Sequence, residues 1–117
     1  MSFVVHKNIW TWGESNIIIS DDAFGTVTVQ FFKDEPNLAY ITSLSVYSNA
    51  RNKGLGKLLL HEAERMAKER AGIDEITICC DKNSFVYDWY IREGYDDTGI
   101  ILFGYGDSAV ELKKKVN

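Results

Sequence analysis

Residues 51–57, Arg51-Asn52-Lys53-Gly54-Leu55-Gly56-Lys57, lie between a predicted strand and a predicted helix. Two glycines two positions apart allow the main chain to turn sharply and leave its amide groups uncovered where the helix begins. Such amides and the positive end of the helix dipole bind anions such as phosphate, and three cationic side chains accompany them here. The alternative is a purely structural glycine-rich turn with solvated lysines.

The periodicity of the apolar residues changes on either side of this loop. An apolar strand is expected over Ala39–Val46, and a second short, buried strand over Ile76–Cys80. Between them, Gly54–Ala71 carries its apolar side chains on one helical face, and Gly72 is the glycine that ends this helix. A strand, a helix and a strand in this order predict a right-handed crossover between two parallel strands.

The rest of the sequence predicts further strands and one more helix. The patterns of Asn16–Ser20 and Gly25–Phe32 are typical of strands, and the short turns indicate an antiparallel meander. The predicted fold class is therefore α+β: a mixed, mostly antiparallel sheet with a central parallel β-α-β crossover and helices packed on it, in one domain over residues 1–117. The last elements expected are a helix that follows Asp81–Ser84 and runs to about Glu93, strands over Tyr95–Phe103 and Ala109–Val116, and a hairpin at Gly104–Asp107.

The composition excludes several classes of protein. Hydrophobic residues make up 45% and charged residues 26% of the 117 residues, which is typical of a soluble globular domain. The formal net charge of -4 argues against a nucleic-acid partner, and no apolar run approaches the roughly 20 residues that cross a bilayer. We therefore expect a cytoplasmic protein without a membrane or nucleic-acid partner. The adjacent Cys79 and Cys80 are expected to be structural thiols, one in the core and one covered by a helix, and no metal is expected.

Known phosphate-binding motifs can be told apart by their residues. A P-loop needs Ser or Thr where Leu58 follows Gly56-Lys57, and a dinucleotide-binding fingerprint needs a third glycine where Leu59 stands. The pattern that is present, Arg-x-x-Gly-x-Gly after an apolar strand, closely resembles the main cofactor-binding motif of the GNAT superfamily of N-acetyltransferases.

A second element resembles the same family. Asn83, Tyr90 and Gly94-Tyr95 have the order and spacing of its second motif, so the similarity covers residues 41–95. A short member of the GNAT superfamily implies an N-acetyltransferase that takes acetyl-CoA as acyl donor and needs no metal. The resemblance also implies the GNAT-like acyl-CoA N-acyltransferase fold, in which two central parallel strands splay apart around the pantetheine arm of the cofactor.

The resemblance assigns cofactor-binding roles to individual residues. Main-chain groups of Leu44 and Val46 would pair with the pantetheine amides, and Asn83 would hydrogen-bond the same arm from the facing side. The main-chain amides of Arg51–Gly56, with Lys57 opening the helix, would hold the pyrophosphate.

The implied reaction is direct transfer of the acetyl group to a primary amine of a small molecule, protein or peptide in a ternary complex. A main-chain N–H near Val46 would stabilise the tetrahedral oxyanion. Tyr90 matches the general acid of the family, close to the CoA sulfur; the alternative is a core tyrosine that anchors the second helix. No base is assigned, because the strand before the loop carries Thr42, Ser43 and Ser45 where some relatives have a carboxylate. The sequence places none of the other titratable candidates near the thioester: His6, Glu14, Asp21, Asp22 and His61.

The N-terminal part departs from the family. Relatives usually carry two helices there that form much of the acceptor site, whereas the 38 residues before Ala39 show two strand patterns and no helix. The acceptor side is therefore expected to be open, or to be completed by a second copy of the chain. Trp10 and Trp12, expected on one face of a strand, either line this groove or cover the small core or a dimer contact. The alternatives to an enzyme are a non-catalytic CoA-binding module and an interaction domain whose glycine loop is only structural.

Overall fold

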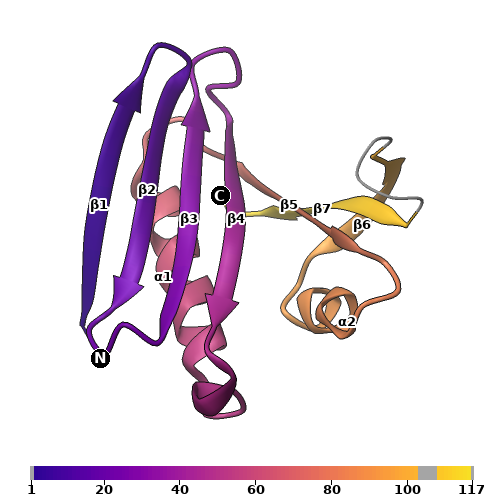
Figure 1. Cartoon of the computed structure of the whole chain (residues 1–117). Coiled ribbons are helices and arrows are strands. Elements are labelled where there is room, and N and C mark those ends of the chain that lie inside the picture. The colour runs from indigo at the N-terminus through magenta and orange to yellow at the C-terminus, as the bar shows by residue number, and fades with distance from the viewer. Residues whose placement is uncertain (1, 103–107, 117) are drawn as a thin grey trace.

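The computed structural model describes residues 2–102 and 108–116, whose strands form one seven-stranded sheet in the order β1-β2-β3-β4-β5-β7-β6 (Figure 1). Neighbouring strands are antiparallel, except that β4 and β5 are parallel and are joined through α1. No helix in the described part of the chain has the length and apolar character that a membrane span requires. In chain order the elements are β1 (Phe3–Trp10), β2 (Gly13–Ser20), β3 (Gly25–Phe32), β4 (Leu38–Val46), the 3-10 turn η1 (Ser48–Ala50), α1 (Leu55–Glu69), β5 (Glu75–Asp81), α2 (Phe85–Arg92), β6 (Asp96–Ile101) and β7 (Ala109–Lys115).

This architecture confirms the predicted α+β fold with its parallel crossover and without N-terminal helices. Strand β1 was not predicted, since the sequence patterns give only two strands before Ala39. Seven of its eight residues are exposed, so neither face of this edge strand has the apolar periodicity on which strand prediction depends. The predicted end of the sixth strand at Phe103 and the predicted hairpin at Gly104–Asp107 lie outside the described residues.

The two faces of the sheet differ in what covers them. On one face, alternate residues of the strands, such as Val27 and Val29 of β3, are fully buried against Leu59 and Ala63 of α1. The residues between them on β3 are only half-buried, because no described helix packs against the second face. We call this second face the open face.

The open face also changes the interpretation of the cysteines. Cys80 packs against the core, as expected of one of the two. Cys79 points to the other side of β5 and is exposed, so the prediction that a helix covers the second thiol is wrong. The reason is that both helices lie on the same side of the sheet.

Candidate functional site

The parallel strands β4 and β5 pair over only part of their length. Their ladder has four residue pairs and ends at Ile41–Ile78; beyond it, over the described residues, β4 continues to Val46 and β5 to Asp81 without pairing to each other. Figure 1 shows the two strands diverging from this region. A gap therefore opens between them, with the unpaired edge of β4 along one side.

A β-bulge in β4 sets the direction of the main chain beside this gap. Ser43 has a φ of 55°, and the register with β3 shifts at this point. After the bulge, the amide of Tyr47 donates to the carbonyl of Phe24 across 2.9 Å, on the β3 side. Because main-chain groups alternate in direction along a strand, those of Val46 and Leu44 point away from β3 and into the gap. These are the two residues predicted to pair with pantetheine.

The carbonyl of Val46 already has a side-chain partner. Arg51 Nε donates to this oxygen over 3.1 Å, from an exposed position just before the glycine loop. A ligand whose amide pairs with the Val46 carbonyl would replace this donor and release the guanidinium toward the loop.

The start of α1 has the features of an anion site. Gly54 takes the left-handed conformation with a φ of 83°, which lets the chain turn into the helix. In α1, all of which the structure describes, no side chain caps the first amides and no acidic residue lies in the first turn. A Cβ added to Gly56 would lie 3.9 Å from Val46 Cγ2, so the helix start adjoins the end of β4. The uncapped amides therefore lie at the end of the gap.

Tyr90 lies on α2 and belongs to the buried core cluster, against which the partly buried Leu44 and Val46 pack. Its side chain is 6% exposed, and its ring contacts the ring of Tyr95 at 5.8 Å. Burial, followed by the nearby Cys80, raises the pKa of Tyr90 to about 12, so the hydroxyl keeps its proton at neutral pH. This hydroxyl has no hydrogen-bond partner among the described residues and can donate to a ligand.

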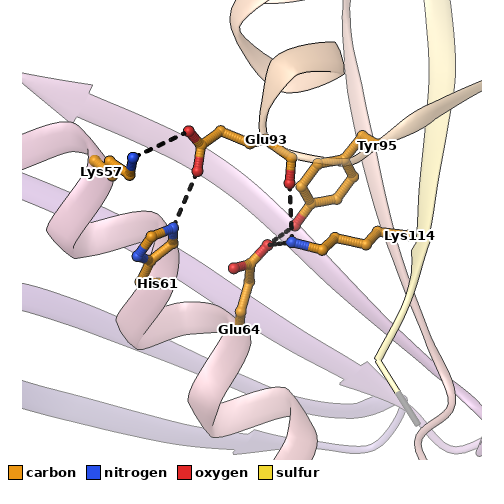
Figure 2. A network of polar contacts seen from close by, with 6 residues as sticks. All are labelled: Lys57, His61, Glu64, Glu93, Tyr95 and Lys114. Atoms are coloured by element: carbon orange, nitrogen blue, oxygen red, sulfur yellow. Dashed lines mark hydrogen bonds and ion pairs between the residues drawn. The ribbon is translucent and has the colours of Figure 1, made fainter.

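A polar network ties the segment after α2 to α1 and β7 (Figure 2). Glu64 of α1, only 6% exposed, accepts hydrogen bonds from the Tyr95 hydroxyl at 2.7 Å and from Lys114 Nζ at 3.0 Å. The same Lys114 ammonium donates to the carbonyl of Glu93 at 2.9 Å. Burial and then the contact with Glu64 raise the pKa of Tyr95 far above its usual value. The network thereby fixes α2, and with it Tyr90, against α1.

This network was not predicted, although the sequence contains one weak signal for it. Glu64 comes four residues after Leu60 and three before Ala67, both of which are buried, so it lies on the apolar side of α1. A charge on the buried side of a helix needs a partner, and the partner comes from β7, far along the chain.

The outer part of the network involves two residues considered for function. The Glu93 carboxylate lies 3.0 Å from His61 Nε2 and 3.7 Å from Lys57 Nζ (Figure 2). Lys57 is therefore at the helix start, as predicted, and its ammonium group forms an ion pair with Glu93. His61 lies on the exposed side of α1, where its ring nitrogen contacts the Glu93 carboxylate, which does not favour a role as base.

We expect Lys114→Met to lower the free energy of unfolding by about 2 kcal/mol, because it leaves the buried Glu64 carboxylate without its cation. The loss is smaller than for a fully buried pair, since Lys114 is partly exposed and Tyr95 still donates to Glu64. Urea unfolding measures it, with Lys115→Met, an exposed neighbour, as control. Equal stabilities of the two variants would show that the network contributes nothing.

Asn83 lies in the turn that joins the end of β5 to α2. The main-chain amide of Asn83 donates to Asp81 Oδ1 at 2.8 Å, and the residue is exposed. It lines a pocket of about 240 Å³ together with Lys82, Ser108 and residues of β6 and β7. The predicted contact of Asn83 with pantetheine therefore stays a prediction.

The other titratable candidates have local partners. Glu14 forms an ion pair with Arg70 at 2.5 Å, and Asp22 accepts a serine hydroxyl at 2.6 Å in the turn after β2. Asp21 accepts a hydrogen bond from the start of the chain, and His6 lies on the edge strand β1. Within residues 2–102 and 108–116, no group of three or more His, Cys, Asp or Glu side chains could hold a metal ion.

The positions of Trp10 and Trp12 correct one expectation. Trp10 ends β1, whereas Trp12 lies in the turn before β2, so the two do not share one strand. Their rings stack with centroids 6.4 Å apart, Trp12 also stacks on Phe32 at 4.9 Å, and Phe32 contacts Tyr40 at 5.1 Å. These four rings form a row across the open face from the β1–β2 turn to β4, which we call the aromatic row. Its use in an acceptor groove or a dimer contact stays a prediction.

Comparisons with known proteins agree on the fold. The model of the Acetyltransferase (GNAT) family matches residues 4–100. Nourseothricin acetyltransferase is similar with a TM-score of 0.71 and 16% identity, over 98% of this chain and 85% of that chain. An acetyltransferase from Bacillus cereus ATCC 14579 is similar with a TM-score of 0.68 and 24% identity, over 95% and 74% of the two chains. N-acetylglutamate synthase from Neisseria gonorrhoeae, complexed with coenzyme A and N-acetyl-glutamate, is similar with a TM-score of 0.71 and 18% identity, over 88% of this chain and 26% of that one. No curated protein matches the chain.

Proposed function

The chain belongs to the acetyltransferase (GNAT) family of acyl-CoA-dependent acyltransferases, and we propose that it transfers the acetyl group of acetyl-CoA to a primary amine of a small molecule, protein or peptide. The observation that carries this proposal is the stretch over which β4 and β5 do not pair, at whose end lies the uncapped start of α1. A cofactor that carries a diphosphate followed by two amides suits a helix start that adjoins an unpaired strand edge.

The cofactor is proposed to bind mainly through main-chain groups. The pyrophosphate would accept hydrogen bonds from the amides of Arg51–Gly56 at the positive end of α1, with Lys57 beside them. The pantetheine amides would pair with Leu44 and Val46 as an added strand pairs with a sheet edge. Asn83 would hydrogen-bond this arm from the β5 side of the gap.

The chemical step then needs three things from the protein. The amine must arrive neutral to attack the thioester carbonyl, and a main-chain N–H near Val46 would stabilise the oxyanion that forms. When the carbon–sulfur bond breaks, the Tyr90 hydroxyl would donate to the leaving thiolate. The tyrosinate left behind would take the proton that the acylated nitrogen loses as it becomes the neutral amide, which restores the Tyr90 hydroxyl.

Two measurements test the proposal. Isothermal titration with CoA is expected to show binding at one site per chain, and acetyl-CoA with a panel of primary amines is expected to release free thiol in step with amide formation. Binding of CoA without thiol release for any amine would favour the alternative, a non-catalytic CoA-binding module. Absence of CoA binding would overturn both and leave an interaction domain.

We further propose that the protein works in the cytosol. Cys79 and Cys80 are both free, and the reducing conditions of that compartment keep such thiols unpaired.

A further inference from the structure

The edge strand β1 leaves a row of main-chain groups unpaired among the described residues. It is the first strand in the sheet order, and all of its residues except Phe3 are exposed. At its start, the amide of Asp21 donates to the carbonyl of Ser2 at 3.1 Å, so the even-numbered residues of β1 exchange hydrogen bonds with β2. The N–H and C=O groups of the odd-numbered residues therefore point away from the sheet. These residues are Phe3, Val5, Lys7 and Ile9.

The two edges of the sheet differ in how regular they are. At the far edge, β6 has a register shift between Asp97 and Ile101, and Gly99 within this segment has a φ of 83°. Such irregularities, like prolines, prevent one sheet edge from pairing with another. The ladder of β1 with β2 runs without a shift over all eight residues of β1, which the structure describes in full and which include no proline. The edge of β1 is therefore a regular template for one more strand.

Strand β1 also exposes large apolar side chains along this edge. Val4 is 52%, Ile9 78% and Trp10 50% exposed, and α1 packs mainly against β3 and β4, which leaves β1 uncovered. A strand beside β1 would remove part of this apolar surface from water. The ammonium group of Lys7 lies 3.7 Å from the Glu14 carboxylate, so its charge is balanced within the chain and does not repel a second strand.

We propose that β1 pairs antiparallel with β1 of a second copy of the chain, about a two-fold axis at His6. Phe3 is then opposite Ile9 of the second copy, and each such pair exchanges two hydrogen bonds. Val5 is opposite Lys7 of the second copy in the same way. This is the symmetric register that pairs all four outward-pointing residues of one strand with those of the other.

The neighbouring symmetric registers fit less well. An axis at Lys7 would place two ammonium-bearing side chains directly opposite each other, which is destabilising. An axis at Val5 would leave Ile9 beyond the end of the second strand. With the axis at His6, two histidine side chains face each other, and histidines are uncharged well above pH 6.5. The charges and the hydrogen-bonding groups of β1 therefore favour the same register.

This pairing joins the two sheets into one and places both open faces on the same side, because opposite residues of antiparallel strands share a face. The two α1 helices lie on the other side, over β3 and β4 of their own sheets and away from the shared edge. Trp10 lies opposite Ser2 of the second copy. The aromatic row of each copy therefore begins at the interface, and both rows border one continuous surface.

Cysteine substitution tests the register. His6→Cys places one thiol of each copy on the axis, where the Cα atoms of a non-hydrogen-bonded pair are about 4.5 Å apart and a disulfide can form. Val4→Cys, exposed on the same face, is the matched control, since its two copies would be about 13 Å apart along the strands. Mild oxidation at pH 8 is expected to give at least about tenfold more disulfide-linked dimer for H6C than for V4C. The wild type shows the background from its exposed Cys79.

A second pair of variants tests the hydrogen bonds. Val5→Pro removes an outward N–H and keeps the ladder with β2, because proline is tolerated where the N–H of an edge strand faces solvent. We expect the dissociation constant of the dimer to rise at least about tenfold in V5P, since two symmetry-related hydrogen bonds are lost. Val5→Thr keeps both the N–H and the branched side chain, and should stay within about threefold of the wild type. Sedimentation equilibrium over a range of concentrations measures the dimer, and urea unfolding shows whether each variant folds.

The possible results separate clearly. A wild-type chain that stays monomeric at every concentration would overturn the second copy as the occupant of this edge, and a dimer that V5P does not weaken would place the interface elsewhere. Equal cross-linking of H6C and V4C would contradict the register, and this comparison decides alone if V5P does not fold. Since no readout involves the cofactor, the inference stands or fails separately from the proposed function.

Discussion

Replacing Tyr90 with phenylalanine is expected to lower the rate of acetyl transfer by about 100-fold while the affinity for CoA changes less than about twofold. The hydroxyl is the only part removed, and it has no partner among the described residues, so the loss leaves no internal hydrogen bond broken. The ring stays packed against Tyr95, and the fold is expected to keep its stability. What disappears is the donor that stabilises the leaving thiolate.

Tyr87→Phe is the matched control for this experiment. Tyr87 lies on the same helix, and its hydroxyl donates to Asp97 at 2.9 Å on the β6 side. Its removal should reduce stability slightly and leave turnover nearly unchanged. Stopped-flow or steady-state thiol release measures the rates, and equal turnover of the two variants would remove Tyr90 from the mechanism.

Replacing Gly56 with alanine is expected to weaken CoA binding by about 10- to 100-fold without unfolding the protein. The protein itself tolerates the added methyl group, since its nearest neighbour would be Val46 Cγ2 at the ordinary contact distance of 3.9 Å. Alanine also favours the helix, so the free energy of unfolding should stay equal or rise by up to about 1 kcal/mol. The same methyl group would stand between the uncapped amides and the end of the gap, where the pyrophosphate is proposed to bind. Losing one charge-assisted hydrogen bond, about 1.5–3 kcal/mol, gives the stated range.

This combination of results separates a ligand site from a structural turn. A glycine needed only for folding would lose stability on substitution and would affect CoA through unfolding. Leu58→Ala, at an exposed position in the same part of α1, serves as control and should bind CoA as the wild type does. Unchanged CoA affinity in G56A, measured by isothermal titration, would contradict the assignment of the pyrophosphate to this helix start.

The parts of the fold that sequence predicts well are those where local chemistry and burial agree. The glycine turn at Gly54 and the apolar face of α1 point to the same helix start, and the structure confirms it. Strand β3 alternates strictly because one face is core and the other is half-covered, and its predicted bounds are those observed. Strand β1 has no buried face, and nothing in its residues distinguishes it from a loop.

The site was only partly predictable for a reason of topology. Whether the main chain of Val46 is free depends on where the β4–β5 ladder ends, and a sequence pattern indicates a strand but not how far it pairs.

The short parallel ladder has a consequence for how the protein acquires its activity during folding. The hairpins of β1–β4 connect neighbouring segments and can form early. In contrast, β4 can pair with β5 only after the 33 residues between the two paired segments, 42–74, have been ordered into the crossover. Closing such a long loop is slow and entropically costly, so we expect the last kinetic barrier to coincide with the pairing of β4 with β5. Nascent or partly refolded chains would therefore hold a native-like meander yet be inert, and cofactor added during refolding should capture only molecules that have passed this barrier.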